Sequence, residues 1–477
     1  MKEFALSIKR NYAKCLKAFR TVRYHFLYIR DATKGIIFTM TNSQTRLYQP
    51  DIETMTRDDI RSLQLSKLQK QVRYVYERVD WYRNKMDEMG VNPSDIRSLE
   101  DVRKLPFTDK TVLRDTFPYG LFAVPLEEVT ELHASSGTTG KPIVVGYNNH
   151  DMQIWSECIA RLACMAGVVP GDRAQMAFGY GMFTGGFGLH YGLQKLGCML
   201  IPAGSGNTDR HLQMINDYGS TVLIATPSYA LHMCEVGEKA GFDWKNSTLR
   251  IGLFGGEPCP PKMKEEIENR MHITCTDNYG LTEVMGPGVA GECLSVRDMQ
   301  HIAEDHFLWE VVDPETGEPV PEGVEGELVL TPLDKQAIPV LRYRTHDLTY
   351  VVTEPCECGR THARMKKVRK RSDDMLIIRG TNVFPSQVED ILSGIKGVTP
   401  FYRIEVDNDT GLDRMKILVE LEPSAFTDSY EEMNGFRKHI AQTLKESMLV
   451  SSEVQLVEPG GIERSMGKTK HVIDRRK

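Results

Sequence analysis

The spacing of hydrophobic residues divides the chain into regions with different predicted structures. Between Asp58 and Met89 the apolar side chains recur at helical spacing, which predicts a helical entry region. Residues 130–350 alternate helical stretches with short runs rich in valine, isoleucine and leucine, and each run ends at glycine or a turn. This alternation is typical of a largely parallel α/β sheet, in which ligands bind at the carboxyl ends of the strands.

Two later runs, EGELVLTPL and LTYVVT, alternate as antiparallel strands do. Beyond Arg371 the order becomes strand, helix, strand, helix, which predicts a compact α+β unit of about 100 residues. We therefore predict an α/β fold in which a large N-terminal domain with mixed sheets, residues 40–371, precedes a small α+β domain, residues 372–477.

Composition narrows the class of protein. A chain of 477 residues exceeds what one core usually supports, so at least two domains are expected. Its apolar runs are shorter than the ~20 residues of a membrane helix. The net charge of −6 gives no case for nucleic acid as a partner. The ten cysteines are mostly scattered singly, which favours a reducing compartment, and we expect the cytoplasm.

Residues 1–39 differ from the rest of the chain in charge. They hold nine lysines and arginines against two acids. Such a segment is typical of a basic amphipathic helix or a presequence-like arm, and a start of translation at Met40 would remove it. We interpret it as a dispensable extension.

The segment SSGTTGKP, from Ser135 to Pro142, has the composition of a phosphate-binding loop. Glycines let backbone N–H groups turn toward an anion, hydroxyls add donors, and the lysine adds charge. It differs from a Walker A loop, which has four residues between its glycines and Ser or Thr after the lysine. The alternative is a polar hairpin turn. The candidate anion-binding residues are Ser135, Ser136, Gly137, Thr138, Thr139, Gly140 and Lys141.

A second segment, TDNYGLTEVMG, begins as a strand that breaks at Gly280 and presents Thr282 and Glu283 at its end. A carboxylate beside phosphates is suited to hold Mg²⁺, an ion that prefers oxygen ligands. The alternative is an acid at a helix start, which the helix dipole favours.

A third segment, LFGGEPCP, places glycines directly after a strand, where a flat ligand such as adenine can approach closely. The alternative is an ordinary turn between a strand and a helix.

Two further segments carry charged candidates. Asp347 can accept hydrogen bonds from both hydroxyls of a ribose, and Arg371 can donate to ribose or phosphate, although a surface ion pair would also explain both. Near the C-terminus, Lys468 follows Gly467 on a flexible-looking turn. A mobile lysine suits the stabilisation of charge in a phosphate–carboxylate transition state, and Lys470 is its rival by spacing.

Together and in this order, these segments resemble the adenylate-forming superfamily of acyl-CoA synthetases, most closely its phenylacetate–CoA ligase family. The resemblance runs from about Tyr48 to the C-terminus and includes HASSGTTGKPIVVGY, FTGGFGLHYG, RSDDMLIIRGTNVFPSQVE and MGKTKHVID. One departure is His471, where the family usually has arginine.

The resemblance implies a role for each matching position. Residues 135–141 would bind the ATP phosphates, with Thr138 and Lys468 acting in catalysis, and Glu283 would hold Mg²⁺. The remaining implied positions are Gly256, Glu257 and Pro258 beside adenine, Tyr279 stacked near it with Gly280 and Thr282 in the same ATP site, Asp347 and Arg371 on the ribose, Asp373 as the hinge, and Gly380 lining the CoA tunnel.

The implied reaction has two halves. A carboxylate attacks the α-phosphorus of MgATP to give an acyl adenylate and pyrophosphate. The small domain then rotates about Asp373, which withdraws Lys468 and opens a path for the CoA thiol. The resemblance thus implies an aryl acid, ATP and CoA as partners, and we expect a homodimer.

The segment FGYGMFTGGFGLHYG is the candidate wall of the acyl pocket, because aromatic residues among glycines offer flat apolar surfaces without crowding. Ordinary helix packing around small residues would explain the same pattern. The candidate residues are Tyr180, Phe183, Gly185 and Gly186.

A grouping of cysteines and one histidine predicts a metal site. Its Cys-x-Cys spacing is tighter than the usual two to four intervening residues, so the motif alone is weak. The family resemblance implies a structural zinc held by four protein ligands, against the alternative of free thiols in a solvated loop. The candidate ligands are Cys293, His301, Cys356 and Cys358, with His306, His362 and Cys275 as alternatives.

Two other functions compete with an aryl-acid–CoA ligase. One is an adenylating synthetase without CoA transfer, such as those acting on a deazaflavin cofactor. The other is a non-catalytic nucleotide-binding regulator on the same fold, which predicts a damaged Lys468 or Glu283 position; both positions are intact.

Overall fold

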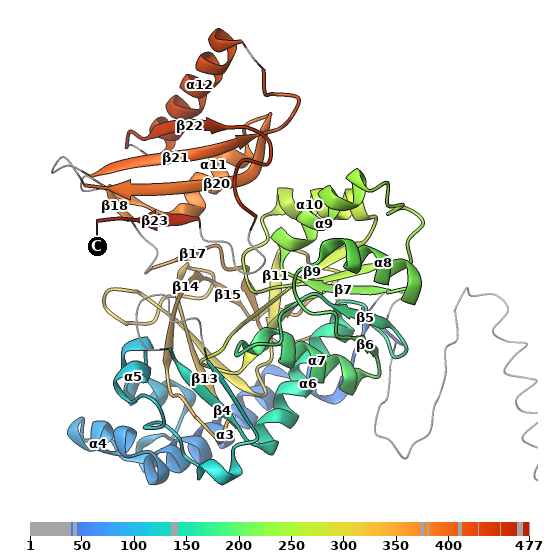
Figure 1. Cartoon of the computed structure of the whole chain (residues 1–477). Coiled ribbons are helices and arrows are strands. Elements are labelled where there is room, and N and C mark those ends of the chain that lie inside the picture. The colour runs from blue at the N-terminus through green and yellow to red at the C-terminus, as the bar shows by residue number, and fades with distance from the viewer. Residues whose placement is uncertain are drawn as a thin grey trace, which may run out of the picture.

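The described chain forms a large N-terminal unit and a smaller C-terminal unit that stands on it (Figure 1). This computed structural model describes residues 40–41, 45–134, 142–372, 376–378, 381–408, 413–427, 429–448, 450–464 and 471–476. None of the helices in these ranges combines the length and the apolarity needed to cross a membrane.

The predicted helical entry region forms two helices rather than one. Helix α3 spans Arg57–Arg78 and α4 spans Asp80–Glu88. Between them Val79 has an extended backbone, with φ −119° and ψ 106°, and its side chain is buried. Neighbouring short elements are the strands β1 (Met40–Thr41) and β2 (Thr45–Arg46), the helices α2 (Pro50–Glu53) and α5 (Lys110–Asp115), and the 3₁₀ turns Pro93–Asp95, Leu99–Lys104 and Leu126–Glu128.

A nine-stranded sheet organises the large unit within the described residues. Five neighbouring strands, from β9 to β6, are parallel, and the four that precede β9 in the sheet order are antiparallel. The expected parallel sheet is therefore half of a mixed sheet. In sheet order the strands are β15 (Val351–Val352), β16 (Arg364–Lys366), β11 (Met299–Ile302), β10 (Gly286–Glu292), β9 (Thr274–Leu281), β8 (Ile251–Phe254), β7 (Val222–Ala225), β5 (Arg173–Met176) and β6 (Met199–Ile201).

Helices connect and cover these strands. Strands β7 and β8 are buried along their whole length, as central strands of a parallel sheet are when helices cover both faces. The hairpin of β3 (Glu131–Ala134) and β4 (Val144–Tyr147) precedes the first of these helices. The helices are α6 (Asn149–Met165), α7 (Thr184–Leu196), α8 (Thr208–Tyr218), α9 (Pro227–Lys239) and α10 (Pro261–Met271).

A second, four-stranded sheet is antiparallel, as predicted for its EGELVLTPL strand. Its register places Asp347 directly opposite Arg371, although 23 residues separate them in the chain. Its strands are β12 (Phe307–Val312), β13 (Gly326–Pro332), β14 (Tyr343–Thr349) and β17 (Lys370–Arg371).

The C-terminal unit has its own hydrophobic core, made by residues from Leu376 to Val454. Its strands and helices alternate much as the sequence predicts. They are β18 (Leu376–Ile378), β19 (Thr381–Val383), α11 (Pro385–Ser393), β20 (Val398–Asp407), β21 (Arg414–Leu421), α12 (Tyr430–Met448), β22 (Glu453–Val457) and β23 (Val472–Asp474).

The two units contact each other around α9. Phe401 and Ile462 from the C-terminal unit belong to the same buried cluster as Tyr229. Arg464 lies with its guanidinium carbon 3.3 Å from the Phe401 ring centroid, and it pairs with Glu235 of α9 at 3.3 Å. A mixed apolar and charged contact of this kind is typical of domains that can move relative to each other.

Candidate active site

The carboxylate of Asp347 lies where the two sheets of the large unit meet. The Tyr279 hydroxyl donates to its Oδ2 at 2.5 Å, and Nη1 of Arg371 lies 2.8 Å from its Oδ1. Burial and the neighbouring Asp347 charge raise the pKa of Tyr279 well above its usual range, so this hydroxyl is a donor. The structure thus brings together three predicted residues from β9, β14 and β17. Each oxygen of an ionised carboxylate can accept more than one hydrogen bond, as contacts to ribose hydroxyls would require.

The glycines after β8 allow close backbone approach. A side chain at Gly255 would lie 2.7 Å from the Asn278 amide nitrogen, and Gly256 has φ +84°, which favours glycine. Glu257 accepts a hydrogen bond from the Ser228 backbone nitrogen at 2.8 Å, so it is tied to the first turn of α9. These residues and Pro258, which the sequence analysis predicted to lie beside adenine, directly follow the carboxyl end of β8.

Glu283 lies in the turn that follows β9 and is 6% exposed. Gly280 admits no side chain, because a Cβ there would lie 2.0 Å from the Gly286 carbonyl oxygen. The Thr282 and Thr184 hydroxyls lie 3.1 Å apart, which joins this turn to the start of α7. A nearly buried carboxylate at a strand end fits the oxygen-ligand chemistry of Mg²⁺.

A buried lysine that the sequence analysis missed faces this turn. Lys335 is fully buried. Burial lowers the pKa of its ammonium to about 8, while the charges of Asp151 and Glu283 oppose that shift. No motif marks this lysine, and only its unusual burial identifies it.

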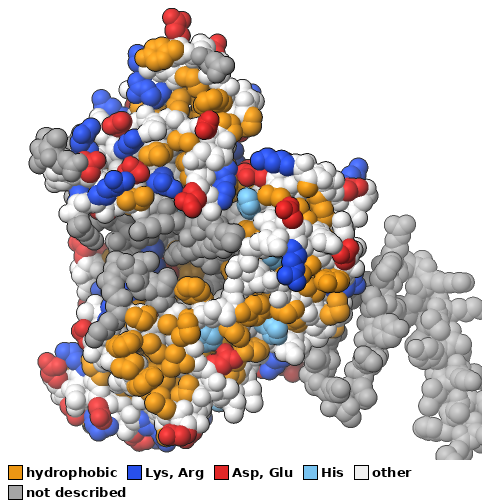
Figure 2. All heavy atoms as spheres, viewed as in Figure 1, with side chains coloured by type: hydrophobic (Ala, Val, Ile, Leu, Met, Phe, Trp, Pro, Cys, Tyr) orange, Lys and Arg blue, Asp and Glu red, His pale blue; other side chains and the backbone are white. Residues whose placement is uncertain are grey.

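The predicted acyl-pocket residues divide into packed and open positions. The Tyr180 hydroxyl lies 3.0 Å from Nδ1 of His190, and a Cβ at Gly186 would lie 2.7 Å from the Gly179 carbonyl oxygen. Burial raises the pKa of Tyr180 to about 12. By contrast, Gly185 faces open space, and Phe183 is 52% exposed. Figure 2 shows hydrophobic side chains gathered on the visible face of the large unit.

A polar group that includes Tyr191 of this segment was also missed. The Tyr191 hydroxyl donates to one Glu131 carboxylate oxygen, and Nε2 of His133 lies 3.0 Å from the other. These residues come from α7 and β3, and none of the three was a candidate site residue in the sequence analysis.

Several predicted residues lie outside the described part of the chain. They are the anion-binding segment Ser135, Ser136, Gly137, Thr138, Thr139, Gly140 and Lys141, the hinge residue Asp373, the tunnel residue Gly380, and the lysines Lys468 and Lys470.

The four predicted metal ligands are gathered at one buried point, with their ligand atoms all within 4.8 Å of one another. The Cys293 and Cys356 sulfurs lie 3.8 Å apart, and the Cys358 sulfur lies 3.4 Å from Nε2 of His301. Tetrahedral zinc with Zn–S bonds of about 2.3 Å would separate two sulfurs by roughly 3.8 Å. The donor set therefore fits zinc in both chemistry and spacing.

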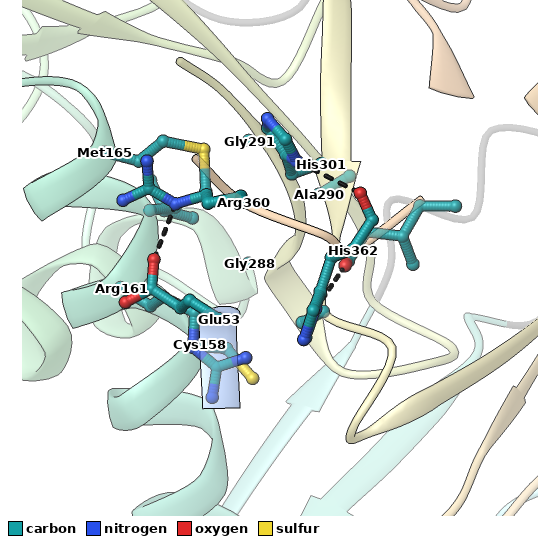
Figure 3. A pocket seen from close by; sticks show the side chains of 13 residues that line it. Glu53, Cys158, Arg161, Met165, Gly288, Ala290, Gly291, His301, Arg360 and His362 are labelled. Carbon is teal, nitrogen blue, oxygen red and sulfur yellow. Dashed lines mark hydrogen bonds and ion pairs between the residues drawn. The ribbon is translucent and has the colours of Figure 1, made fainter. Parts of the chain in front are cut away.

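The surroundings of the cluster also match a metal site. Nδ1 of His301 lies 3.3 Å from the His362 carbonyl oxygen, an arrangement that leaves Nε2 for the metal (Figure 3). The alternative ligands lie apart from this group. His306 pairs with Asp334 at 3.0 Å, and Nε2 of His362 contacts the Ile52 carbonyl oxygen at 3.0 Å. Cys275 is likewise absent from the four-ligand group.

Met165 of α6 packs against the three cysteines of the cluster. Beside them lies a small pocket lined by His301, His362 and Arg360 and by residues of α6 (Figure 3). Arg360 and Glu53 form an ion pair of 2.5 Å at its edge, and both side chains are almost completely buried. Glu53 also accepts from the backbone nitrogens of Tyr48 and Gln49. The loop carrying Cys356 and Cys358 therefore anchors the segment that enters the large unit.

Comparisons with known proteins identify the class. The AMP-binding enzyme family matches residues 83–331, and the AMP-binding enzyme C-terminal domain matches residues 380–476. The chain therefore belongs to the adenylate-forming enzymes. It is 45% identical over 444 residues to the phenylacetate-coenzyme A ligase of Thermus thermophilus, with 90% of this chain and 100% of that protein covered. Within the class, the chain belongs to the phenylacetate–CoA ligase family.

Solved structures of a 2-hydroxyisobutyryl-CoA ligase in two functional states indicate how the two units of this chain are placed. Its postadenylation state, in complex with R3-HIB-AMP, matches with a TM-score of 0.85 at 28% identity, covering 95% of this chain and 96% of that one. Its thioesterification state matches with a TM-score of 0.68 at 28% identity, covering 96% of each chain. Because both states belong to one protein, the difference indicates that the units lie here closer to the postadenylation arrangement.

Proposed function

We propose that the chain converts an aryl acid, of the phenylacetate or a related arylacetate class, to its CoA thioester with ATP, releasing AMP and pyrophosphate. The Tyr279–Asp347–Arg371 cluster, with Glu283 in the turn after the strand of Tyr279, supports this most directly, because it offers candidate ribose and metal ligands where the two sheets meet. Phenylacetate-coenzyme A ligases from four bacteria are 43–46% identical to the chain, which favours CoA transfer over adenylation alone.

Asp347 and Arg371 would fix the ribose, residues 135–141 would bind the phosphates, and Glu283 would hold Mg²⁺, which supplies charge stabilisation at the phosphates. Lys468 would neutralise charge as the acid's carboxylate oxygen attacks the α-phosphorus. After pyrophosphate leaves, the C-terminal unit would turn about Asp373 and bring Gly380 to the path of the CoA thiol. The sulfur would then attack the acyl carbon and expel AMP.

A screen for pyrophosphate release tests this function. Phenylacetate, hydroxyphenylacetate, indoleacetate and benzoate are each supplied with MgATP, with and without CoA. We expect pyrophosphate with at least one acid, and a thioester product only when CoA is present. Absence of pyrophosphate with every acid, from folded protein loaded with zinc, would contradict the proposal. Stable adenylate that CoA leaves unchanged would support adenylation without CoA transfer instead.

Replacing Lys468 with alanine should remove adenylation and spare thioester formation from a supplied acyl adenylate. The reason is that charge neutralisation serves only the first half-reaction. Pyrophosphate release and thioester formation are measured separately, and Lys470→Ala is the matched control. Equal loss of both half-reactions in Lys468→Ala, or loss of adenylation only in Lys470→Ala, would contradict the assignment.

We further propose that Cys293, His301, Cys356 and Cys358 hold a structural zinc, because four protein ligands leave no open position for substrate. We also propose a reducing compartment such as the cytoplasm, which the absence of disulfides among the described cysteines supports. We also propose that the protein is a homodimer and that the boundary between its two domains lies between residues 371 and 372. Size-exclusion chromatography with light scattering tests the dimer, and limited proteolysis tests the boundary.

A further inference from the structure

Three buried side chains hold the backbone of the turn that carries Glu283. The Lys335 ammonium donates to the carbonyl oxygen of Val284 at 3.0 Å. The Tyr147 hydroxyl donates to that of Met285 at 2.9 Å. The Trp155 indole N–H donates to that of Pro287 at 2.9 Å. The turn and the start of β10 therefore have side-chain donors on three of the four carbonyls that directly follow Glu283.

The three donors also pack on one another. The Tyr147 and Trp155 rings stack with centroids 4.6 Å apart and planes 14° apart, and the Lys335 nitrogen lies 4.4 Å from the Tyr147 centroid. All three side chains are fully buried. A side chain at Gly286 would come within 2.7 Å of the Trp155 ring, so the turn lies directly against this stack. A donor that cannot rotate away fixes the carbonyl that it contacts.

Lys335 is itself fixed on both sides. Its carbonyl oxygen accepts from the Gln71 side chain of α3 at 2.7 Å. The Asp151 carboxylate accepts from the backbone nitrogens of Gln336 and Ala337 at 2.7 and 2.9 Å. These contacts, from α3 and the first turn of α6, place the ammonium beneath the turn.

We propose that Lys335, with Tyr147 and Trp155, is a positioning residue for Glu283, and that this cradle sets the Mg²⁺ requirement of adenylation. The proposal rests on the proposed function, since it assumes that Glu283 holds the metal. Tyr147 ends β4, the strand that follows residues 135–141, so the cradle also connects that strand to the turn of Glu283. Residues that orient a metal ligand typically change metal affinity or activity 10- to 100-fold when removed.

Lys335→Met keeps the length of the side chain and removes the donor. We expect the Mg²⁺ concentration for half-maximal ATP–pyrophosphate exchange to rise roughly 10-fold or more, with thioester formation from a supplied acyl adenylate unchanged. If Lys335 positions Glu283, its removal should raise the Mg²⁺ requirement. If it acts only through its charge, its removal should lower that requirement, because an ammonium near the site repels Mg²⁺. A lower or unchanged Mg²⁺ requirement in the variant would overturn the proposal.

Two further variants separate positioning from folding. Lys264→Met removes another buried ammonium but leaves Glu292 paired with Lys367, and its Mg²⁺ requirement should match that of the wild type. Tyr147→Phe removes only the hydroxyl that contacts Met285. If Lys335→Met does not fold, this variant tests whether the three donors position Glu283. We expect a smaller rise in its Mg²⁺ requirement, and no rise would overturn the cradle. A wild-type protein without any exchange would refute the proposed function itself.

Discussion

Glu283→Gln is expected to lower the rate of adenylation by about 1,000-fold. Mg²⁺ is a hard cation that prefers charged oxygen ligands, and an amide oxygen at this position keeps the shape but loses the charge. Stabilisation of transition-state charge by a metal ion contributes several kcal/mol, and about 4 kcal/mol corresponds to three powers of ten in rate. ATP–pyrophosphate exchange with the preferred acid measures this half-reaction.

The second half-reaction is the internal control for this substitution. Thioester formation from a supplied acyl adenylate needs no metal at the phosphates, so Glu283→Gln should retain it. Glu431→Gln, an exposed substitution on α12 of the C-terminal unit, should leave both half-reactions unchanged. Full adenylation by Glu283→Gln would show that this carboxylate does not hold the metal, and parallel loss of both activities would point to a damaged fold.

Removal of the proposed zinc is expected to destabilise the large unit by about 5 kcal/mol, because a bound structural metal adds its binding free energy to folding. Cys358→Ser, or prolonged chelation, should lower the melting temperature by about 10 °C or more. The loss should be this large because Arg360 and Glu53, which anchor the entering segment, are a buried ion pair held by the same loop. Breaking up such a pair leaves an uncompensated buried charge.

Metal analysis and calorimetry together test this expectation. The wild type should contain one zinc per chain and Cys358→Ser should contain none. Cys198→Ser changes a buried cysteine outside the cluster, so it should keep the zinc and most of the stability. A zinc-free wild type with unchanged melting behaviour, or full zinc content in Cys358→Ser, would refute the assignment.

Local pattern predicted much of the fold because strands and helices follow the period of the hydrophobic residues. The alternation after residue 130 correctly indicated an α/β sheet, and EGELVLTPL correctly indicated an antiparallel strand. Local pattern did not predict the pairing of β9, a continuous strand that is parallel to β8 and antiparallel to β10. Strand direction depends on the route of the chain between strands, which local periodicity does not encode.

In the candidate active site, too, local pattern indicated residue types, whereas tertiary contacts decided which residues meet. From the sequence, Asp347 and Arg371 were candidates by residue type alone, and the register of β14 and β17 is what pairs them with each other in a partly buried position beside Tyr279. Lys335 carried no motif, because its importance comes from complete burial and from one carbonyl 51 residues away in the chain.

By itself, then, the sequence determined the order of the elements, the chemistry available at each strand end and the family resemblance, since these depend on residue types and their local spacing. Only the tertiary structure decided which of those groups meet. It gathered the four zinc-ligand candidates within 4.8 Å while separating the alternatives, and it placed Lys335, Tyr147 and Trp155 behind the turn of Glu283. The physical reason is that burial and long-range pairing are properties of the packed chain, and they fix the charge, orientation and partners of each side chain.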